Sequence, residues 1–425
     1  MIWQVGLLGL GTVGAGTAAI LGDPAGRHPL LEKLHLRAVG VRHLHKPRHL
    51  SLEPGVLTTH LESIATDPEI HIVVELLGGL EPARTLILAA LQHGKHVVTA
   101  NKAVIAHHGA EIFTAATAAG RYVLMEGAVG GGIPIVQPLK QALGANRLHT
   151  VMGIVNGTTN YILTRMAQEG ADFAAVLQDA QRLGYAEADP TADVDGWDAA
   201  DKIAILASLA FGERVKRESV VCEGIRAVTA TDIAYAERLG YVIKLLALAY
   251  QRPAGLDIRV HPTLVPQAHP LASVNGVNNA ILVGGDPLGE VMLEGPGAGA
   301  GPTASAVVGD ILTAAAALEA GLGFHPLLSC NHEGFAETLP LAQIASRFYV
   351  RLLSQDQPGV IGQLGTCFGR HAVSLESIVQ IGHQEGLAEI VVITHEVNHG
   401  QLQAALEDIR ALAALQSVPS LFRVL

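Results

Sequence analysis

The sequence predicts an α/β protein in three parts: a doubly wound parallel sheet, an α+β middle region and a C-terminal ferredoxin-like unit. Over residues 1–132, short apolar runs alternate with helical segments, which is typical of a doubly wound sheet. The pattern changes at residue 133 and again after 322–346, a stretch interrupted by prolines and a glycine that we interpret as a linker. Residues 347–425 follow the order βαββαβ of a ferredoxin-like fold.

Short apolar runs locate the strands of the first part. The predicted strands are Val5–Leu8, Leu34–Val41, His71–Leu77, His96–Ala100 and Tyr122–Met125. Residues 133–321 combine strand-like runs with longer helical patterns, which makes this middle part α+β. Its predicted helices lie near 160–168, 172–183, 196–211, 231–250 and 303–320.

Composition excludes several classes of protein. The net charge is −11 and no long basic run occurs, so we expect no binding to nucleic acid. No apolar run approaches the ~18 residues of a transmembrane helix, and the N-terminus lacks the basic region of a signal peptide. Cys222, Cys330 and Cys367 lie far apart and form no disulfide or zinc pattern, so we expect a cytoplasmic protein.

Gly9, Gly11 and Gly14 form a GxGxxG motif between the first predicted strand and a helix. In this context the first glycine makes a tight turn, the second lets the backbone approach a pyrophosphate, and the third allows close packing. The N-terminus of the helix then faces the phosphates. The motif therefore favours a Rossmann-type dinucleotide site, although a purely structural glycine turn would have the same pattern.

The end of the second strand bears on the choice of cofactor. NAD-binding proteins usually place an acidic residue there to bind the ribose hydroxyls. No acidic residue occurs between Leu34 and Leu52, where Arg42, Lys46 and Arg48 stand instead. This favours NADP(H), with NAD possible, while the alternative is a solvated basic loop.

The most informative segment is 184–202, which is rich in carboxylates and ends in a single lysine. Its charged residues are Glu187, Asp189, Asp193, Asp195, Asp198, Asp201 and Lys202. Asp198 and Lys202 are four residues apart and share a helix face, so they could form an ordinary ion pair. Asp195 could also cap the helix. Neither alternative explains so many carboxylates, which suit a site that binds an ammonium group and places a lysine near a carbonyl.

With these motifs, the chain resembles the homoserine dehydrogenases along its whole length. The matching stretches are 9–14, 100–102, 126–134, 156–160, 184–202 and 295–306. The C-terminal unit, with Asp356–Val360, looks like an ACT domain, so the layout is that of a monofunctional member. The resemblance implies a dinucleotide-binding domain at 1–132, completed by the helix near 303–320. It also implies a catalytic and dimerisation domain at 133–321 and a regulatory domain at 347–425.

The resemblance further implies reversible reduction of L-aspartate 4-semialdehyde to L-homoserine, in the biosynthesis of threonine, methionine and isoleucine. Lys202 would be the general acid and base at the C4 oxygen, because an ammonium can donate a proton to a developing alkoxide. Glu187 and Asp198 would hold the amino acid. Asp189 and Asp193 would either support them or be structural.

The same resemblance assigns residues to the cofactor. Lys102 would lie near the nicotinamide and the substrate. The backbone of Thr12 and Val13 would contact the pyrophosphate, and Gly78 and Gly301 would approach the cofactor.

A monovalent cation, Na⁺, is also implied. Glu126 would provide a carboxylate, and Val129, Gly131 and Ile133 would provide backbone oxygens. Glycines suit a loop whose carbonyls converge on a hard cation. Sequence chemistry alone indicates only a glycine-rich turn, and we expect a structural role for the ion.

An ACT domain can bind an amino-acid effector such as threonine, or it can serve assembly alone, and the resemblance also implies a homodimer or homotetramer. Two other functions make different demands on the sequence. An acylating semialdehyde dehydrogenase needs a reactive cysteine in a site motif, which we do not find. An NADP-sensing ACT regulator should lack the constellation around Lys202.

Overall fold

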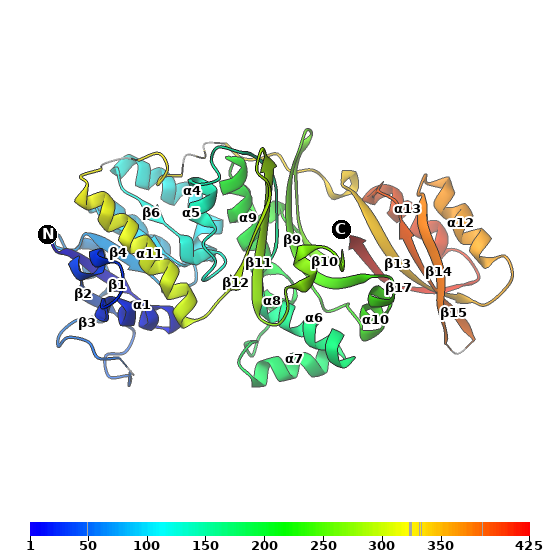
Figure 1. Cartoon of the computed structure of the whole chain (residues 1–425), viewed down its shortest axis with the longest axis horizontal. Coiled ribbons are helices and arrows are strands. Elements are labelled where there is room, and N and C mark those ends of the chain that lie inside the picture. Colours follow the sequence, from blue (N-terminus) through cyan, green and yellow to red (C-terminus); the bar gives the residue numbers. More distant parts are fainter. Residues whose placement is uncertain (49, 323–324, 331, 333, 385) are drawn as a thin grey trace. The chain divides into compact units, whose positions relative to one another are not determined.

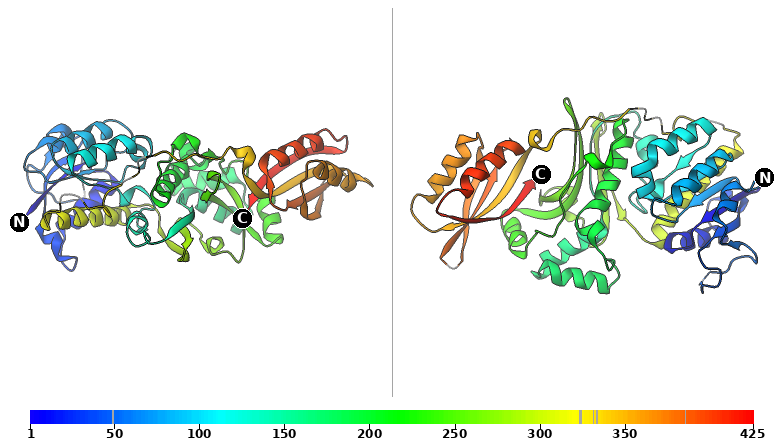
Figure 2. Two further views of the ribbon diagram at one scale, coloured as in Figure 1. Left: turned by 90° about the horizontal axis from the view of Figure 1, so that it is seen from above. Right: turned by 180° about the vertical axis from the view of Figure 1, so that it is seen from behind.

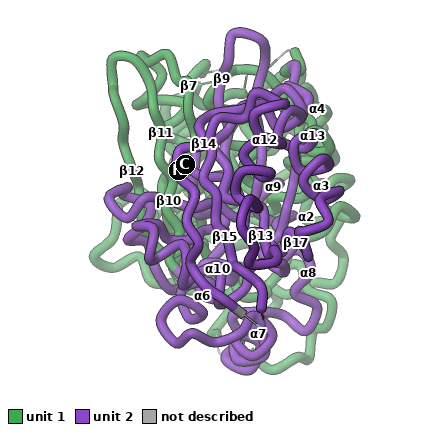
Figure 3. Tube along the Cα trace, turned by 90° about the vertical axis from the view of Figure 1, so that its right-hand side faces the viewer, with its two compact units in different colours: residues 1–151, 201–219, 278–336 green, residues 152–200, 220–277, 337–425 purple. Residues whose placement is uncertain are grey.

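The structure is a computed structural model that describes residues 1–425 except 49, 323–324, 331, 333 and 385 (Figure 1). The chain folds into two compact units, and each unit is assembled from three separate stretches of sequence (Figure 3). Unit 1 comprises residues 1–151, 201–219 and 278–336. Unit 2 comprises residues 152–200, 220–277 and 337–425.

Unit 1 contains a six-stranded parallel sheet in the order β3-β2-β1-β4-β5-β6. The strands are β1 Trp3–Leu8, β2 Leu34–Gly40, β3 Leu57–Thr58, β4 Ile72–Glu75, β5 His96–Thr99 and β6 Val123–Leu124. This order reverses direction at β1, as in dinucleotide-binding sheets. The predicted Rossmann-type fold is therefore confirmed, with β3 as an additional short edge strand.

Helices cover this sheet, and one of them comes from far along the sequence. They are α1 Thr12–Gly22, α2 Leu61–Thr66, α3 Ala83–Gln92, α4 Lys102–Ala119 and α11 Ala300–Glu319. Val307 and Ile311 of α11 belong to the same buried core as the strands. α11 also packs closely on α1, because a Cβ at Gly16 would lie 2.5 Å from the carbonyl oxygen of Ala300.

α11 is the one described helix that is long and apolar enough to cross a membrane. Half of its most apolar window is buried inside the protein. Its apolar side chains face the sheet and α1, which is the pattern of a core helix.

Unit 1 also holds α5 Val136–Lys140 and the hairpin of β11 Asn278–Asp286 and β12 Gly289–Pro296. β11 lies beside β7 Arg147–Ile154, the strand in which the chain passes into unit 2. This hairpin contains the two apolar runs Ala280–Val283 and Glu290–Leu293, which the sequence predicts as strands of the middle part.

Unit 2 begins with helices and continues with a long antiparallel strand pair. The helices are α6 Gly157–Glu169, α7 Phe173–Arg182, α8 Thr191–Val194 and α10 Ala230–Arg238. α9, Trp197–Phe211, begins in unit 2 and continues in unit 1. The strand pair consists of β9 Tyr241–Arg252 and β10 Gly255–Pro266, aligned along their whole lengths.

The helix predicted at 231–250 is wrong in its second half. α10 ends at Arg238, and Gly240 adopts a φ of 82°, a left-handed conformation that suits glycine at a helix end. The apolar run that follows forms β9, which pairs with β10. A continuous apolar run has no period that separates a buried strand from a buried helix, so the pairing partner decides its structure.

The C-terminal part of unit 2 has the predicted βαββαβ order. Its elements are β13 Ala345–Gln355, α12 Val360–Arg370, β14 Leu375–Gln384, β15 Leu387–Thr394, α13 His399–Arg410 and β17 Leu415–Val424. A short strand, β16 Val397–Asn398, pairs with the start of β13. α12 and α13 pack side by side and share a buried core with the sheet (Figure 2).

The sheet of this C-terminal part is not separate from the rest of unit 2. Its strands continue the order β9-β10-β17-β13-β15-β14, in which β17 pairs in parallel with β10. A buried ion-pair cluster adds to this connection. Arg351 of β13 lies 2.8 Å from Asp232 of α10 and 3.0 Å from Glu389 of β15, and Tyr235 of α10 donates a hydrogen bond to Glu389.

Candidate functional site

The glycine motif forms a tight turn between β1 and α1. Gly9 has a φ of 101°, and its N–H donates to the carbonyl of Gly40 at 3.0 Å. A Cβ at Gly14 would lie 2.2 Å from the carbonyl oxygen of Gly9, so this position requires glycine for packing. A Cβ at Gly11 would have no atom within 4 Å. Gly11 is therefore the glycine that leaves space in front of α1.

That space suits a pyrophosphate. α1 begins at Thr12, which is exposed, and Val13 is half-buried. No side chain caps the N-terminus of α1. The first N–H groups of a helix lack intrahelical acceptors and attract anions, so the turn fits the phosphates of a dinucleotide.

The basic loop after β2 divides its cations between two roles. The Arg48 guanidinium donates to the carbonyls of His43, Leu44 and Lys46 at 2.6, 2.9 and 2.9 Å. Arg48 therefore stabilises the loop through hydrogen bonds to its backbone. Arg42 and Lys46 are exposed, so both side chains are accessible to an anion.

At the carboxyl end of the neighbouring strand β4 lies a buried carboxylate that the sequence analysis did not identify. Glu75, the last residue of β4, accepts hydrogen bonds from Thr99 Oγ1 at 2.7 Å and from Asn101 Nδ2 at 3.4 Å. The same Nδ2 donates to the carbonyl of Gly79 at 2.7 Å. Burial raises the pKa of Glu75. A carboxylate inside the apolar run 71–77 was the available signal.

This network fixes the start of α4. Asn101 is the N-cap of α4 and accepts from the N–H of Val104 at 3.3 Å. Lys102, the first residue of α4, is half-buried. Gly78 has a φ of 73° and is exposed beside this edge. Lys102 and Gly78 thus lie at the carboxyl ends of parallel strands, where ligands of open α/β sheets bind.

Gly301, the last predicted cofactor residue, is exposed in the first turn of α11, and a Cβ there would meet no atom within 4 Å. Because the preceding residue, Ala300, packs against Gly16 of α1, Gly301 lies near the same helix.

The acidic segment of unit 2 is organised by a residue to which we had given no role. Asn156 is the N-cap of α6 and accepts from the N–H of Thr159 at 2.8 Å. Its Nδ2 donates to Asp193 Oδ1 at 2.7 Å and to Asp198 Oδ2 at 2.9 Å. One amide group therefore holds two carboxylates close together. The motif 156–160 was visible, but its partner carboxylates lie some 40 positions further along the chain.

α9 places the two central residues of the segment one helical turn apart. Asp198 is buried in the first turn, and Lys202 is half-buried in the next. Glu187 is exposed in the loop before α8, where its carbonyl accepts from Gln181 Nε2 at 3.0 Å. Residues four apart lie on one helix face, so Asp198 and Lys202 point to the same side of α9.

The remaining carboxylates of the segment have structural partners. Asp195 pairs with Arg226 at 2.5 Å, and Asp201 pairs with Arg217 at 2.6 Å. Hydrogen bonds from the side chain of Thr191 and from its N–H, the latter at 3.1 Å, lower the pKa of Asp189. α9 begins at Trp197, so the alternative in which Asp195 caps this helix does not describe the structure.

The Glu126 loop departs from the predicted cation site. The Glu126 carboxylate is buried and accepts from the N–H groups of Ile135, Val136 and Gln137 at 2.6, 2.8 and 2.7 Å. It thereby caps the N-terminus of α5, where the helix dipole stabilises a negative charge. A carboxylate bound by three N–H groups has little capacity left for a cation, so the ligand role predicted for this side chain does not fit. Among the described residues, no cluster of three His, Cys, Asp or Glu side chains forms a metal site.

The other predicted cation residues are held by tight backbone packing. Gly131 has a φ of 55°, and a Cβ there would lie 2.4 Å from the carbonyl oxygen of Gly297. Val129 and Ile133 are buried, and the N–H of Ile133 donates to the carbonyl of Gly130 at 2.9 Å. The carbonyl oxygens of this loop are the donors that a cation could still use.

The predicted effector loop lies between β13 and α12. Asp356 is exposed, and its carboxylate lies 3.7 Å from the imidazole of His383. Gly359 is the N-cap of α12 and has a φ of 92°. The loop thus presents a carboxylate and an uncapped helix N-terminus.

Comparisons with known proteins agree on one family. The homoserine dehydrogenase family model matches residues 134–312, its NAD-binding domain model matches 9–126, and an ACT domain model matches 348–414. A homoserine dehydrogenase of Synechocystis is 62% identical over 432 residues and covers 100% of both chains.

Solved structures give the same result. The crystal structure of a homoserine dehydrogenase from Thiobacillus denitrificans is 42% identical, covers 100% of this chain and 98% of its own, and has a TM-score of 0.92. A hyperthermophilic archaeal homoserine dehydrogenase in complex with NADPH is 26% identical, covers 77% of this chain and 100% of its own, and has a TM-score of 0.62.

Proposed function

The chain belongs to the homoserine dehydrogenase family and is an NAD(P)-dependent oxidoreductase, and from this premise we propose that it interconverts L-aspartate 4-semialdehyde and L-homoserine with NADP(H). The product would then serve the synthesis of threonine, methionine and isoleucine. The observation that carries the site assignment is the pair of carboxylates on Asn156, with Lys202 one turn along α9. Negative charge fixed beside an ammonium-bearing side chain suits an amino-acid aldehyde.

Lys202 is proposed as the general acid and base. The bound cofactor supplies a hydride to the aldehyde carbon or accepts it from homoserine. In the reducing direction, the Lys202 ammonium donates a proton to the C4 oxygen, which becomes the hydroxyl of homoserine. In the reverse direction, the neutral amine takes that proton back. A half-buried ammonium stabilises the developing alkoxide more than it would in water.

Substrate binding is assigned to Glu187 and Asp198. Asp198 is buried and held by Asn156, so its carboxylate is oriented before the substrate arrives. Asp193 shares the same amide and adds a second negative charge. Glu187 is exposed on the adjacent loop and would complete the contacts with the substrate ammonium.

Cofactor binding is assigned to the open turn of unit 1. Gly9, Gly11 and Gly14, with the backbone of Thr12 and Val13, would hold the pyrophosphate at α1. Lys102 would lie near the nicotinamide, while Gly78 and Gly301 would allow close approach. Arg42 would bind the 2′-phosphate, because Arg48 is committed to the loop backbone. The NADPH complex named for the archaeal structure supports this choice.

A monovalent cation, Na⁺, is proposed as structural and bound by backbone oxygens. Val129, Gly131 and Ile133 would provide them, and the Glu126 residue would contribute through its carbonyl, since its carboxylate caps α5. Thermal unfolding in NaCl against tetramethylammonium chloride tests this proposal. Equal unfolding temperatures in the two salts would contradict it.

Feedback control is proposed at the C-terminal part, residues 347–425, with residues 1–132 as the cofactor domain and 133–321 as the catalytic and dimerisation domain. Asp356–Val360 would bind an amino-acid effector such as threonine. A homodimer or homotetramer is the expected assembly. Initial rates with and without threonine, measured alongside the sedimentation of the full chain, test both proposals.

The decisive experiment for the function uses Lys202→Ala. Turnover of homoserine with NADP should fall by about 10³-fold or more, in line with loss of a proton donor that also stabilises charge. Binding of NADPH, followed by its fluorescence, should change little. Lys33→Ala, at an exposed lysine paired with Glu319, is the matched control. Normal turnover in Lys202→Ala would overturn the assignment.

A further inference from the structure

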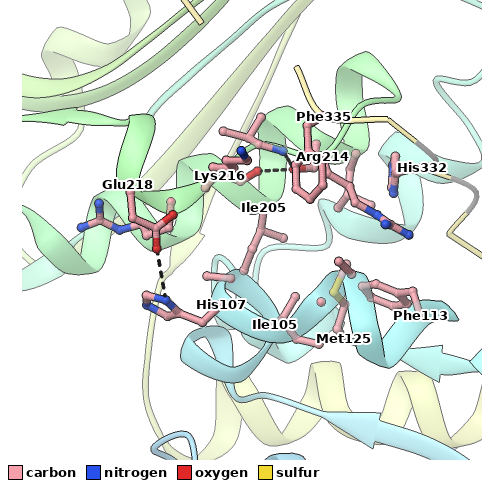
Figure 4. Close-up of a pocket in the computed structure, with 18 residues that line it drawn as sticks. Ile105, His107, Phe113, Met125, Ile205, Arg214, Lys216, Glu218, His332 and Phe335 are labelled. Atoms are coloured by element: carbon pink, nitrogen blue, oxygen red, sulfur yellow. Dashed lines mark hydrogen bonds and ion pairs between the residues drawn. The ribbon is translucent and has the colours of Figure 1, made fainter. Parts of the chain in front are cut away.

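Unit 1 contains a pocket that includes none of the residues assigned above (Figure 4). It has a volume of about 150 Å³ and lies along α4 and the second half of α9. Residues 214–218 and the side chains of His332 and Phe335 form the rest of its wall. The pocket is therefore a separate feature from the edge at Lys102 and from the carboxylates on Asn156.

One part of the pocket is apolar. Ile105, Met125 and Ile205 are buried side chains of its wall, and Phe113 adds an aromatic ring (Figure 4). An apolar cavity of roughly 150 Å³ accommodates a ring the size of benzene. This part suits a six-membered ring or a branched aliphatic chain.

The other part carries more positive than negative charge. Arg214, Lys216 and Arg217 line it, whereas Glu218 is the one carboxylate among the described lining residues. Glu218 lies 3.7 Å from the imidazole of His107 (Figure 4). Arg217 is paired with Asp201 at 2.6 Å. The excess positive charge thus resides on Arg214 and Lys216.

These two cations are held at the pocket by their surroundings. The N–H of Arg214 donates to the carbonyl of Gly334 at 2.9 Å, and the N–H of Ala336 donates to the carbonyl of Arg214 at 2.9 Å. The ammonium of Lys216 lies 5.1 Å from the centre of the Phe335 ring. Burial, Lys140 and Arg214 lower the pKa of His332 to about 4, so His332 is neutral near pH 7 and offers one hydrogen-bond donor.

We propose that this pocket binds a small carboxylate that carries an apolar ring or branched chain. The carboxylate would contact Arg214 and Lys216, and the apolar body would lie among Ile105, Phe113, Met125 and Ile205. A guanidinium binds a carboxylate with two parallel hydrogen bonds, and the apolar wall accounts for the remainder of the ligand.

Such a ligand would be well placed to influence turnover. The walls of the pocket belong to the helix that starts at Lys102 and to the helix that carries Lys202. The remaining wall includes Phe335, which precedes the C-terminal part in the sequence. A ligand shifts a conformational equilibrium only if it binds one state more tightly, and contact with these three elements provides a means for that difference.

The test uses 4-fluorobenzoate and the full chain, with binding followed by fluorine NMR. Wild type should bind the probe, and Arg214→Gln should weaken binding about tenfold, the loss expected for a hydrogen bond between charged groups. Arg182→Gln, at an arginine whose side chain is 70% exposed on α7, is the matched control. Binding requires no turnover, so failure here is distinguishable from failure of the proposed activity.

A second variant fills the pocket without removing charge. A Cβ at Gly109 would make ordinary contacts of 3.5 Å with Phe113 and 3.8 Å with Ile105. Gly109→Leu should therefore fold, since leucine also favours a helix interior, and it should abolish binding of the probe. Ala118→Leu, at an exposed position of the same helix, should bind like wild type.

Several outcomes would overturn the proposal. One is equal binding by wild type, Arg214→Gln and Gly109→Leu, and another is no binding by wild type. Equal binding of 4-fluorobenzyl alcohol would remove the role of the carboxylate. Displacement of the probe by inorganic phosphate would indicate a simple anion site. Loss of binding as protein concentration rises would indicate that a second copy of the chain fills the pocket.

Discussion

The cofactor edge of unit 1 is formed mainly by backbone groups, whereas the acidic segment of unit 2 is formed by side chains. At the cofactor edge, Gly9 and Gly14 allow a tight turn, Gly11 leaves open space, and no side chain of the N-cap residue occupies the N-terminal N–H groups of α1. In the acidic segment, side chains define the geometry, because one amide of Asn156 orients Asp193 and Asp198. A backbone site depends on residues adjacent in sequence, whereas a side-chain site depends on residues that only the fold brings together.

After Lys202→Ala, the largest expected effect comes from changing Asn156 to aspartate. Asn156→Asp keeps an acceptor for the N-cap of α6 but replaces two donated hydrogen bonds with repulsion between three carboxylates. Losing hydrogen bonds to charged groups costs roughly 3 kcal/mol for two bonds, or about 100-fold in kcat/KM. Steady-state kinetics with homoserine measure this loss.

A structural role for Asn156 alone would give a different result. In that case Asn156→Asp would lower the unfolding temperature and leave kcat/KM of the folded enzyme unchanged. Asn146→Asp provides the control, because the Asn146 side chain donates to the nearby carbonyl of Leu143 and lies outside the acidic segment. The pH profile of kcat/KM should shift in Asn156→Asp but not in the control.

At the cofactor edge, two glycines should fail in different ways. Gly11→Ala places a methyl group in the open space and should weaken NADPH binding about 30-fold, as overpacking of roughly 2 kcal/mol implies. The fold should survive. Gly14→Ala drives a methyl group against the carbonyl of Gly9 and should lower the unfolding temperature of the free protein. Calorimetry and NADPH fluorescence separate the two, and equal destabilisation would refute the distinction.

The basic loop should show a smaller effect. Arg42→Ala removes an exposed cation and should raise KM for NADPH about tenfold, in line with the loss of one charged hydrogen bond, while KM for NADH changes little. Arg48→Ala should raise both constants together, because it releases three loop carbonyls. If Arg48→Ala alone altered the preference for NADPH, the two roles would have to be exchanged.

The smallest expected effect is a loss of folding stability at acid pH through His96. Burial and Arg121 lower the pKa of His96 to about 4, and its Nδ1 accepts from the N–H of Tyr122 at 3.0 Å. A folded pKa below the unfolded value of about 6.5 means that stability is full above pH 6.5 and falls as pH drops towards 4. In the acidic segment, the pKa of Asp189 is lowered, so its contribution is lost only at lower pH.

Between pH 7.5 and pH 5, amide hydrogen exchange should therefore become faster in β5 and β6 of the cofactor sheet. The acidic segment should show this change only at lower pH. His96→Gln retains an acceptor and should reduce this pH dependence by about 1 kcal/mol per pH unit. An unchanged slope in the variant would assign the acid sensitivity to another group.

The comparison also explains what could be predicted. The sheet around Val5–Leu8 and the glycine turn follow from local patterns, so the sequence alone sufficed for these two features. The resemblance provided Lys202 and Asp198, but neither Asn156 nor Glu75, because their partners lie on other strands and helices. β9 was mistaken for helix since an apolar run of that length has no distinguishing period until β10 pairs with it.

The Arg351 cluster has a consequence for the evolution of this architecture. The ACT model begins at residue 348, which suggests a detachable cassette. Yet Asp232, which is 0% exposed, takes its counter-charge from Arg351, across that boundary. Replacing Arg351 by an uncharged side chain would leave a buried carboxylate without its guanidinium, a loss of roughly 3–5 kcal/mol. We therefore expect that replacing residues 348–414 by the ACT domain of a relative destabilises this chain unless α10 is replaced with them.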